Sequence, residues 1–259
     1  MKKLIEVVQE AGRNCVAIGH FNIADLVMLK GVFQAARELN LPVMVGASEG
    51  EREFVGTRQL AAVVRSHREE LDFPIFLNAD HTHSLAKGME AVKAGFDSVV
   101  FDLSALPFEE NARSTHQAVE ELKSINSAVV VEGETGDIGS GSEIHADGPS
   151  PDRALTTPEE ALQFVAETRV DVLAPAVGNS HGMRKSMVTG KERKHLAIER
   201  IVEIKSATCV PLTLHGGSGS ADEDLKAAIR AEINIRPHQY GTASGLETRT
   251  ASWSRATPG

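Results

Sequence analysis

The stretch CVAIGHFNIADLVMLKGVFQAARELNLPVMV, residues 15–45, reads as a short apolar strand, an amphipathic helix and a second apolar strand. Apolar residues recur at helical spacing between 26 and 36, and Asn40 followed by Pro42 marks the end of the helix. A strand, a helix and a strand in this order favour two parallel strands joined by a crossover helix.

The same alternation continues along the chain. Further strands are expected at 74–77, 98–101, 128–132, 172–177 and 210–215, with another beginning at 233–235. Helices are expected at 57–66, 84–94, 108–125, from 157 on, and at 195–206 and 221–232. The 259 residues suit a (β/α)8 TIM barrel, which needs about 250 residues. The rival is a doubly wound sheet, but no G-x-G-x-x-G follows the first strand, which weakens its dinucleotide-binding version.

The composition of the chain argues against several classes of function. The formal net charge of −9 argues against nucleic-acid binding, which needs a basic surface. No apolar run is long enough to span a bilayer, so no membrane partner is expected. Cys15 and Cys209 are interpreted as two buried, reduced thiols of a cytoplasmic protein.

Nearly every expected strand ends in polar residues, which in a barrel would share one rim. Three of them are histidines, His81, His181 and His215, after the third, sixth and seventh strands. A single loop histidine is usually a surface residue. Three at strand ends predict a metal centre, because three imidazoles with an open fourth position are typical of catalytic zinc.

Acidic residues accompany these histidines. Asp80 precedes His81, and because neighbours on a strand point opposite ways, one could bind metal while the other acts as a general acid or base. The alternative role for Asp80 is a cap for the helix near Ser84. Asp102, Glu132 and Glu134 could be partners of metal ligands, a second cation site or a structural ion network, and spacing alone leaves these open.

The segment HGGSG, residues 215–219, is a candidate phosphate cradle, because backbone N–H groups before a helix bind anions. Alone it is weak, since many turns between strand and helix need glycine. No lysine stands at the end of an expected strand, which favours a metal over a Schiff-base lysine.

Six motifs in order resemble those of the class II, metal-dependent fructose/tagatose-bisphosphate aldolases over residues 1–235: FNIADLVMLKG (21–31), ADHTHS (79–84), VFDLSALPFEEN (100–111), VEGETGDIG (131–139), GNSHG (178–182) and LHGGSG (214–219). The resemblance implies a zinc-dependent lyase that cleaves a ketose 1,6-bisphosphate to dihydroxyacetone phosphate and glyceraldehyde 3-phosphate. It also implies a homodimer or homotetramer.

The resemblance assigns roles residue by residue. It makes the three histidines the zinc ligands, Asp80 the group that moves the proton of the C4 hydroxyl, and Glu143 a loop acid that acts on the ketose carbon, although its spacing from Glu134 is one residue longer than in the best-known members. Asp102 and Glu134 match acids of a second or displaced divalent site. The substrate-binding positions would be Ser48, Gly182, Lys185, Gly216, Gly217 and Ser218, with a monovalent cation near the glycines.

The chain leaves the family pattern after Ile235. Pro237 is expected to stop the eighth strand there, and residues 236–259, rich in Gly, Ser, Thr and Arg, are expected to form an irregular tail. A frameshift near Arg236 is our hypothesis for this change, so Asn234 is left out of the site. The nucleotide sequence would test this hypothesis, and a homologue with an unbroken reading frame and the same C-terminal sequence would contradict it.

Three functions compete at this point. The first is an active zinc aldolase. The second is a catalytically impaired barrel that still binds metal or sugar phosphate, because loss of strand eight would expose the edges of strands one and seven. The third is a metal-dependent hydrolase, which predicts an H-x-H pair after strand one. Here strand one ends HFN, and the H-x-H pair, His81 and His83, follows strand three.

Overall fold

The computed structural model describes residues 2–139, 144–145 and 154–238. Its strands are β1 (Ile18–Asn22), β2 (Val43–Ala47), β3 (Ile75–Thr82), β4 (Ser98–Phe101), β5 (Val130–Thr135), β6 (Ile144–His145), β7 (Val172–Pro175), β8 (Met183–Arg184), β9 (Leu212–Thr213) and β10 (Ile233–His238). Its helices are α1 (Leu4–Arg13), α2 (Leu26–Leu39), α3 (Glu49–Val55), α4 (Thr57–Leu71), α5 (Leu85–Ala94), α6 (Phe108–Ile125), α7 (Pro158–Thr168), α8 (Lys185–Val188), α9 (Ile198–Thr208) and α10 (Asp222–Arg230).

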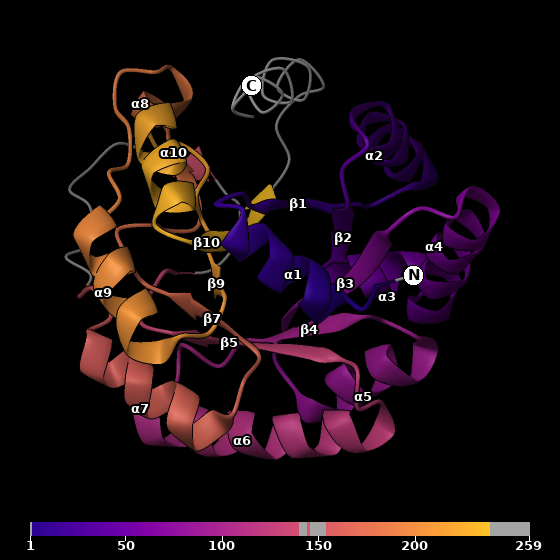
Figure 1. Cartoon of the computed structure of the whole chain (residues 1–259), viewed down its shortest axis with the longest axis horizontal. Coiled ribbons are helices and arrows are strands. Elements are labelled where there is room, and N and C mark those ends of the chain that lie inside the picture. Colours follow the sequence, from indigo (N-terminus) through magenta and orange to yellow (C-terminus); the bar gives the residue numbers. More distant parts are fainter. Residues whose placement is uncertain (1, 140–143, 146–153, 239–259) are drawn as a thin grey trace.

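Parallel strands close into a barrel in the order β1-β10-β9-β7-β5-β4-β3-β2, which confirms the predicted fold class. The helices that connect them lie outside, as Figure 1 shows for the arc from α4 through α7 to α9. The remaining two strands, β6 and β8, form a separate two-stranded sheet beyond the ends of β5 and β7.

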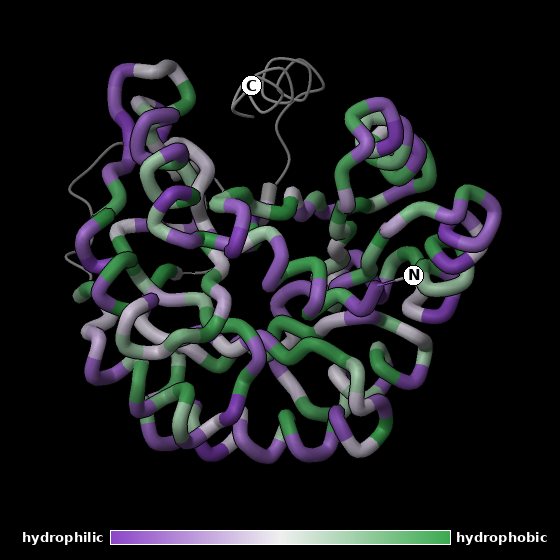
Figure 2. Tube along the Cα trace, in the orientation of Figure 1, coloured by the Kyte–Doolittle hydropathy of each residue, from purple (hydrophilic) through white to green (hydrophobic). Residues whose placement is uncertain are grey.

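The core has two parts, on the two faces of the barrel wall. The larger lies between strands and outer helices, where green apolar segments alternate with purple polar ones along the helices in Figure 2. The smaller lies inside the barrel, where Ile18, Phe76 and Ile235 pack against Leu4 and Val8 of α1. Burying Leu4 and Val8 contributes about 1.5–3 kcal/mol each. Helix α1 therefore fills one end of the barrel, and the opposite end is the one available for a functional site.

The eighth barrel strand is longer than predicted. Pro237 was expected to end it after Ile235, but β10 continues to His238 and pairs with β1 at Ile18↔Ile235 and His20↔Pro237. Beyond Ile235 the strand has no register partner in β9, so its end resembles a sheet edge, where proline is tolerated. The expectation of a disrupted strand was wrong, and so was the inference that strands one and seven have exposed edges.

Helix α3 was not predicted. Its seven residues include Gly50 and no apolar stripe, so periodicity could not reveal it. The signal that could have done so is the capping box of Ser48 and Glu51, in which each side chain bonds the other residue's backbone N–H.

The two cysteines correct a second expectation. Cys15 and Cys209 are both free, but both are exposed rather than buried. Each follows the end of a helix with a positive φ, 52° for Cys15 and 59° for Cys209. The chain turns there from helix to strand on the outside of the barrel, which leaves both thiols at the surface.

Candidate metal centre and active site

The three predicted histidines meet at the centre of the barrel rim. The His81 ring centroid lies 4.7 Å from that of His181 and 4.8 Å from that of His215. With Glu134 at the end of β5, they offer ligand atoms that all lie within 4.8 Å of one another. Segments separated by over a hundred residues are brought together because parallel strands end on one rim.

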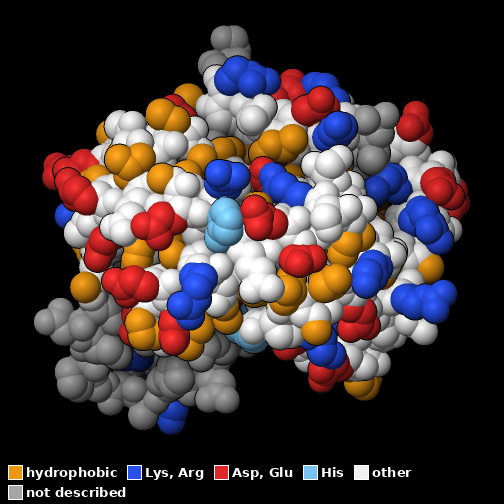
Figure 3. Space-filling view, turned by 90° about the horizontal axis from the view of Figure 1, so that it is seen from below, with side chains coloured by type: hydrophobic (Ala, Val, Ile, Leu, Met, Phe, Trp, Pro, Cys, Tyr) orange, Lys and Arg blue, Asp and Glu red, His pale blue; other side chains and the backbone are white. Residues whose placement is uncertain are grey.

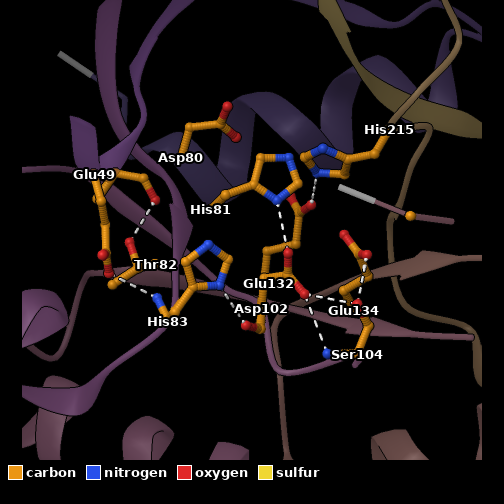
Figure 4. Close-up of polar contacts among 12 residues, drawn as sticks. Glu49, Asp80, His81, Thr82, His83, Asp102, Ser104, Glu132, Glu134 and His215 are labelled. Carbon is orange, nitrogen blue, oxygen red and sulfur yellow. Dashed lines mark hydrogen bonds and ion pairs between the residues drawn. The ribbon is translucent and has the colours of Figure 1, made fainter. Parts of the chain in front are cut away.

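Two of the histidines are oriented by buried carboxylates. His81 Nδ1 lies 2.9 Å from Asp102 Oδ2, and His215 Nε2 lies 2.6 Å from Glu132 Oε1 (Figure 4). Thr213 Oγ1 donates to the other oxygen of Glu132 at 2.8 Å. Each contact fixes the ring and leaves the opposite nitrogen, Nε2 of His81 and Nδ1 of His215, for a metal.

The donor set fits a divalent cation. His81 Nε2, both ring nitrogens of His181 and Glu134 Oε2 are buried without a hydrogen-bond partner in the described part of the chain. Buried polar atoms are rarely left in this state unless a ligand or ion satisfies them. Three imidazoles and one carboxylate are donors that zinc and similar ions prefer.

The close approach of these histidines and acids shifts their pKa values. Burial and the neighbouring His81 and His215 lower the pKa of His181 to about 3. Burial also opposes charge on His81, but Asp80, Asp102 and Glu134 outweigh it and raise its pKa to about 10. Burial and the nearby Asp102 raise the pKa of Glu134 to about 7. A bound divalent ion would favour neutral imidazoles and an ionised carboxylate.

Asp80 lies beside the histidines and is held as a carboxylate. Its Oδ2 accepts a hydrogen bond from Asn22 Nδ2 at 2.9 Å. Burial alone would raise its pKa, but His81, His20 and the other neighbours outweigh burial and hold its pKa well below the usual range. The helix-cap alternative was wrong, because Ser84 caps α5 itself.

The strict alternation expected of Asp80 and His81 does not hold. His81 has a φ of 37°, and the register of β3 against β4 shifts between Ala79 and Thr82. A left-handed residue at a bulge re-aims its side chain. Figure 4 shows the Asp80 carboxylate and the His81 ring in the same central region.

The acids assigned to a second metal position occupy different places. Glu134 belongs to the histidine group, whereas Asp102 lies behind His81 and accepts from the backbone N–H and the hydroxyl of Ser104. The same hydroxyl reaches Glu134 Oε1 at 2.9 Å, so Ser104 links the two carboxylates.

The predicted substrate-binding residues differ in their placement. Ser48 is the N-cap of α3, and its hydroxyl donates to Glu51 Oε2 at 2.9 Å. Lys185 is exposed at the first residue of α8, outside the buried group. Glu143 lies outside the described residues.

Two glycine-containing loops, residues 178–182 after β7 and residues 215–219 after β9, come close together. A Cβ on Gly216, whose φ is 56°, would lie 2.5 Å from the carbonyl carbon of Ser180, so only glycine fits there. Gly182 lies on the first of these loops, and Gly217 and Ser218 continue the second toward α10.

Sequence reasoning missed two supporting residues and left the role of a third open. Glu132 was one of several open possibilities, yet it is the partner of His215. Arg52, buried in α3, donates to the carbonyls of Ala47 and Asp80 at 2.5 and 3.1 Å and braces β3 from behind. Lys194, between α8 and α9, donates to backbone carbonyls near the glycine loops. The alternation of Glu132 with Glu134 along the strand was a signal for Glu132. The periodicity of the sequence contained no signal for Arg52 or Lys194.

Asn234, omitted from the predicted site, lies apart from the histidines. Its Oδ1 accepts from the backbone N–H of Leu212, and its amide nitrogen faces Gly12 of α1. Among the described residues, no helix is both long and apolar enough to cross a membrane.

Comparison with known proteins places the chain among aldolases. The profile of the family described as fructose-bisphosphate aldolase class-II matches residues 2–236. The chain is 36% identical to the fructose-bisphosphate aldolase of Helicobacter pylori, covering 89% of this chain and 73% of that one. It is 33% identical to the sulfofructosephosphate aldolase of Alkalicoccus urumqiensis, covering 88% and 78%. The crystal structure of the YdjI aldolase from Escherichia coli K12 superposes with a TM-score of 0.80 at 27% identity, covering 98% and 88%.

Proposed function

The chain belongs to the class II fructose-bisphosphate aldolase family, and from that membership we propose that it is a zinc enzyme cleaving a ketose 1,6-bisphosphate, fructose or tagatose, to dihydroxyacetone phosphate and glyceraldehyde 3-phosphate. Members of this family are metal-dependent lyases that act on phosphorylated sugars. The observation that carries the proposal is the buried group of three histidines and one glutamate with unpartnered ligand atoms.

His81, His181 and His215 would hold the zinc, with Glu134 as a further or alternative ligand. When bound, the metal would polarise the substrate carbonyl and stabilise the negative charge that develops on the ketose half. Asp102 and Glu132 keep two of the imidazoles in the tautomer and orientation that ligation needs. A second divalent position would use Glu134 and Asp102, which Ser104 already links.

Asp80 is the acid/base residue in this proposal. Cleavage breaks the C3–C4 bond, and the proton of the C4 hydroxyl must leave as the aldehyde forms. Asp80 accepts that proton in this proposal, and the hydrogen bond from Asn22 fixes the orientation of its carboxylate. Glu143 is proposed to return a proton to C3 of the ketose half. Ser48, by its position at the end of β2, is proposed to contact the aldehyde carbonyl.

The substrate phosphate is proposed to bind at Gly182, Gly216, Gly217 and Ser218, with Lys185 as an outer contact. The two loops lie against each other and precede a helix whose first turn starts at Asp222. Positive φ values at Gly182 and Gly216 suit loops that present backbone N–H groups to an anion.

We also propose a cytoplasmic homodimer or homotetramer without nucleic-acid or membrane partners, whose aldolase domain extends beyond the expected boundary at residue 235 to the end of β10 at His238. Two free cysteines suit a reducing compartment. Figure 3 shows Lys and Arg side chains scattered among Asp and Glu on the face drawn. Val27 and Phe54, exposed by 79% and 86%, are candidates for burial between subunits.

A second candidate substrate is a sulfonated ketose phosphate, because one relative of similar identity is named for it. A coupled cleavage assay would compare fructose 1,6-bisphosphate, tagatose 1,6-bisphosphate and sulfofructose 1-phosphate, with zinc and with a chelator. Chelator-sensitive turnover of a bisphosphate supports the proposal. Turnover of the sulfonated sugar alone replaces the substrate, and no turnover with one zinc bound per chain favours the impaired barrel.

A further inference from the structure

Lys194 places a buried ammonium group between the two glycine loops. The residue is 7% exposed. Its Nζ donates to the carbonyl oxygens of Ser180 at 2.5 Å, Gly182 at 2.8 Å and Gly216 at 3.2 Å. These carbonyls come from the loop that follows β7 and the loop that follows β9, so one charge joins both.

The backbone of Lys194 is fixed on both sides. Its N–H donates to Gly219 O at 2.9 Å, and its carbonyl accepts from Ala221 N at 3.2 Å. Lys194 also forms an isolated parallel bridge with Ser220. The side chain therefore extends inward from a segment that is itself paired with the end of the second loop.

Three carbonyl oxygens directed at one buried point require a positive charge. Their dipoles repel one another, and each loses solvation that must be replaced. The close approach of Gly216 to Ser180 leaves the oxygens little freedom to turn away. Such groups of carbonyls are also what dehydrated potassium ions bind. An ammonium ion and a potassium ion have the same charge and similar size, so one can stand for the other.

We propose that Lys194 is a built-in monovalent cation that fills this three-carbonyl cage, so that the chain needs no dissociable potassium or sodium ion there. The expectation of a monovalent cation near Gly182 and Gly216 is thereby replaced at this position by a residue of the chain. The inference rests on the proposed function only for the identity of the anion nearby.

Lys194 is a positioning residue in this proposal. The first loop carries His181 and the second carries His215, so the ammonium group holds two ligand-bearing segments at a fixed spacing. Its charge also lies between the loops proposed for the substrate phosphate, where it adds to the backbone N–H dipoles. A tethered charge avoids the entropy of capturing a free ion.

The test exploits the volume of the side chain. Lys194→Ala removes the charge and opens space for an ion, whereas Lys194→Met removes the charge but keeps most of the volume. Lys205→Met is the matched control, because Lys205 is also partly buried and donates to one backbone carbonyl, Val210 O, at the far end of α9. Melting temperature is measured while potassium chloride replaces choline chloride at constant ionic strength.

The melting temperatures of the wild-type and control chains should not depend specifically on potassium. The melting temperature of Lys194→Ala should rise with potassium concentration until the site is saturated. Lys194→Met should stay destabilised in both salts. In the aldolase assay, potassium should restore the activity of the alanine variant. The methionine variant should have a KM for the bisphosphate that is about tenfold higher or more, because a tenfold change corresponds to the free energy of about one hydrogen bond to a charged group.

A potassium-specific rise in the melting temperature of the wild-type chain would overturn the proposal. So would a folded alanine variant that potassium does not stabilise. If the alanine variant is insoluble in every salt, the potassium titration of the wild-type chain still decides whether the site is filled by Lys194 or by a dissociable ion. Because melting needs no turnover, these outcomes are independent of whether the proposed reaction is correct.

Discussion

Replacing Glu132 tests how the centre keeps its ligands in place. Glu132 is 4% exposed, and its carboxylate joins His215 Nε2 at 2.6 Å and Thr213 Oγ1 at 2.8 Å. Glu132→Gln keeps the shape and an acceptor oxygen but removes the charge. Glu132→Ala removes the contact and leaves a cavity, so the His215 ring is free to turn.

The size of the effect follows from that difference. Loss of a carboxylate that orients a metal-binding histidine weakens metal affinity by about tenfold to a hundredfold, or about 1.4–2.8 kcal/mol. We expect the glutamine variant near the lower bound and the alanine variant near the upper bound. Glu121→Gln on the exposed face of α6 is the control and should leave affinity unchanged.

The assay is competition for zinc between each variant and a chromogenic chelator, with circular dichroism to confirm folding. Equal zinc affinity in wild type and Glu132→Ala would show that His215 binds the metal without its carboxylate partner, contrary to the expectation. A large loss for glutamine and none further for alanine would show that charge, rather than orientation, carries the effect.

Three other substitutions probe the surroundings of the site. Gly216→Ala should destabilise the fold by about 1–3 kcal/mol, because its Cβ would meet the Ser180 backbone at a φ of 56°, and an unchanged melting temperature would contradict this. Arg52→Met should cost at least about 3 kcal/mol in chemical denaturation, since two backbone carbonyls and the Thr82 hydroxyl lose a buried donor; a smaller loss would mean that water replaces it. Asp80→Asn should lower kcat by about a hundredfold to ten-thousandfold with zinc content unchanged, and a kinetic assay showing normal turnover would remove Asp80 from its role.

The fold was largely readable from the sequence because each strand and helix carries its own local signal. The apolar run that ends in His20 and the helix that ends at Asn40 could be placed within a few residues. Two features were missed because non-local contacts decide them. Pro237 stays in β10 because the strand pairs with β1, and α3 is stabilised by the buried contact of Arg52 with Asp80 O in β3.

The candidate site was readable in part. Barrel geometry forces strand ends together, so the convergence of His81, His181 and His215 could be predicted from where the strands end. Which carboxylate faces which histidine could not, because it depends on strand stagger and on the left-handed bulge at His81. Lys194 was unreadable, because a residue between helices reaches the centre only through the folding of two loops.

Anomalous diffraction at the zinc edge, from crystals grown with zinc, would locate the metal relative to the three histidines. We expect a strong peak bounded by the imidazoles of His81, His181 and His215, with Glu134 beside it. Zinc bound elsewhere, or an empty centre in a chain that still cleaves a ketose bisphosphate, would contradict this expectation.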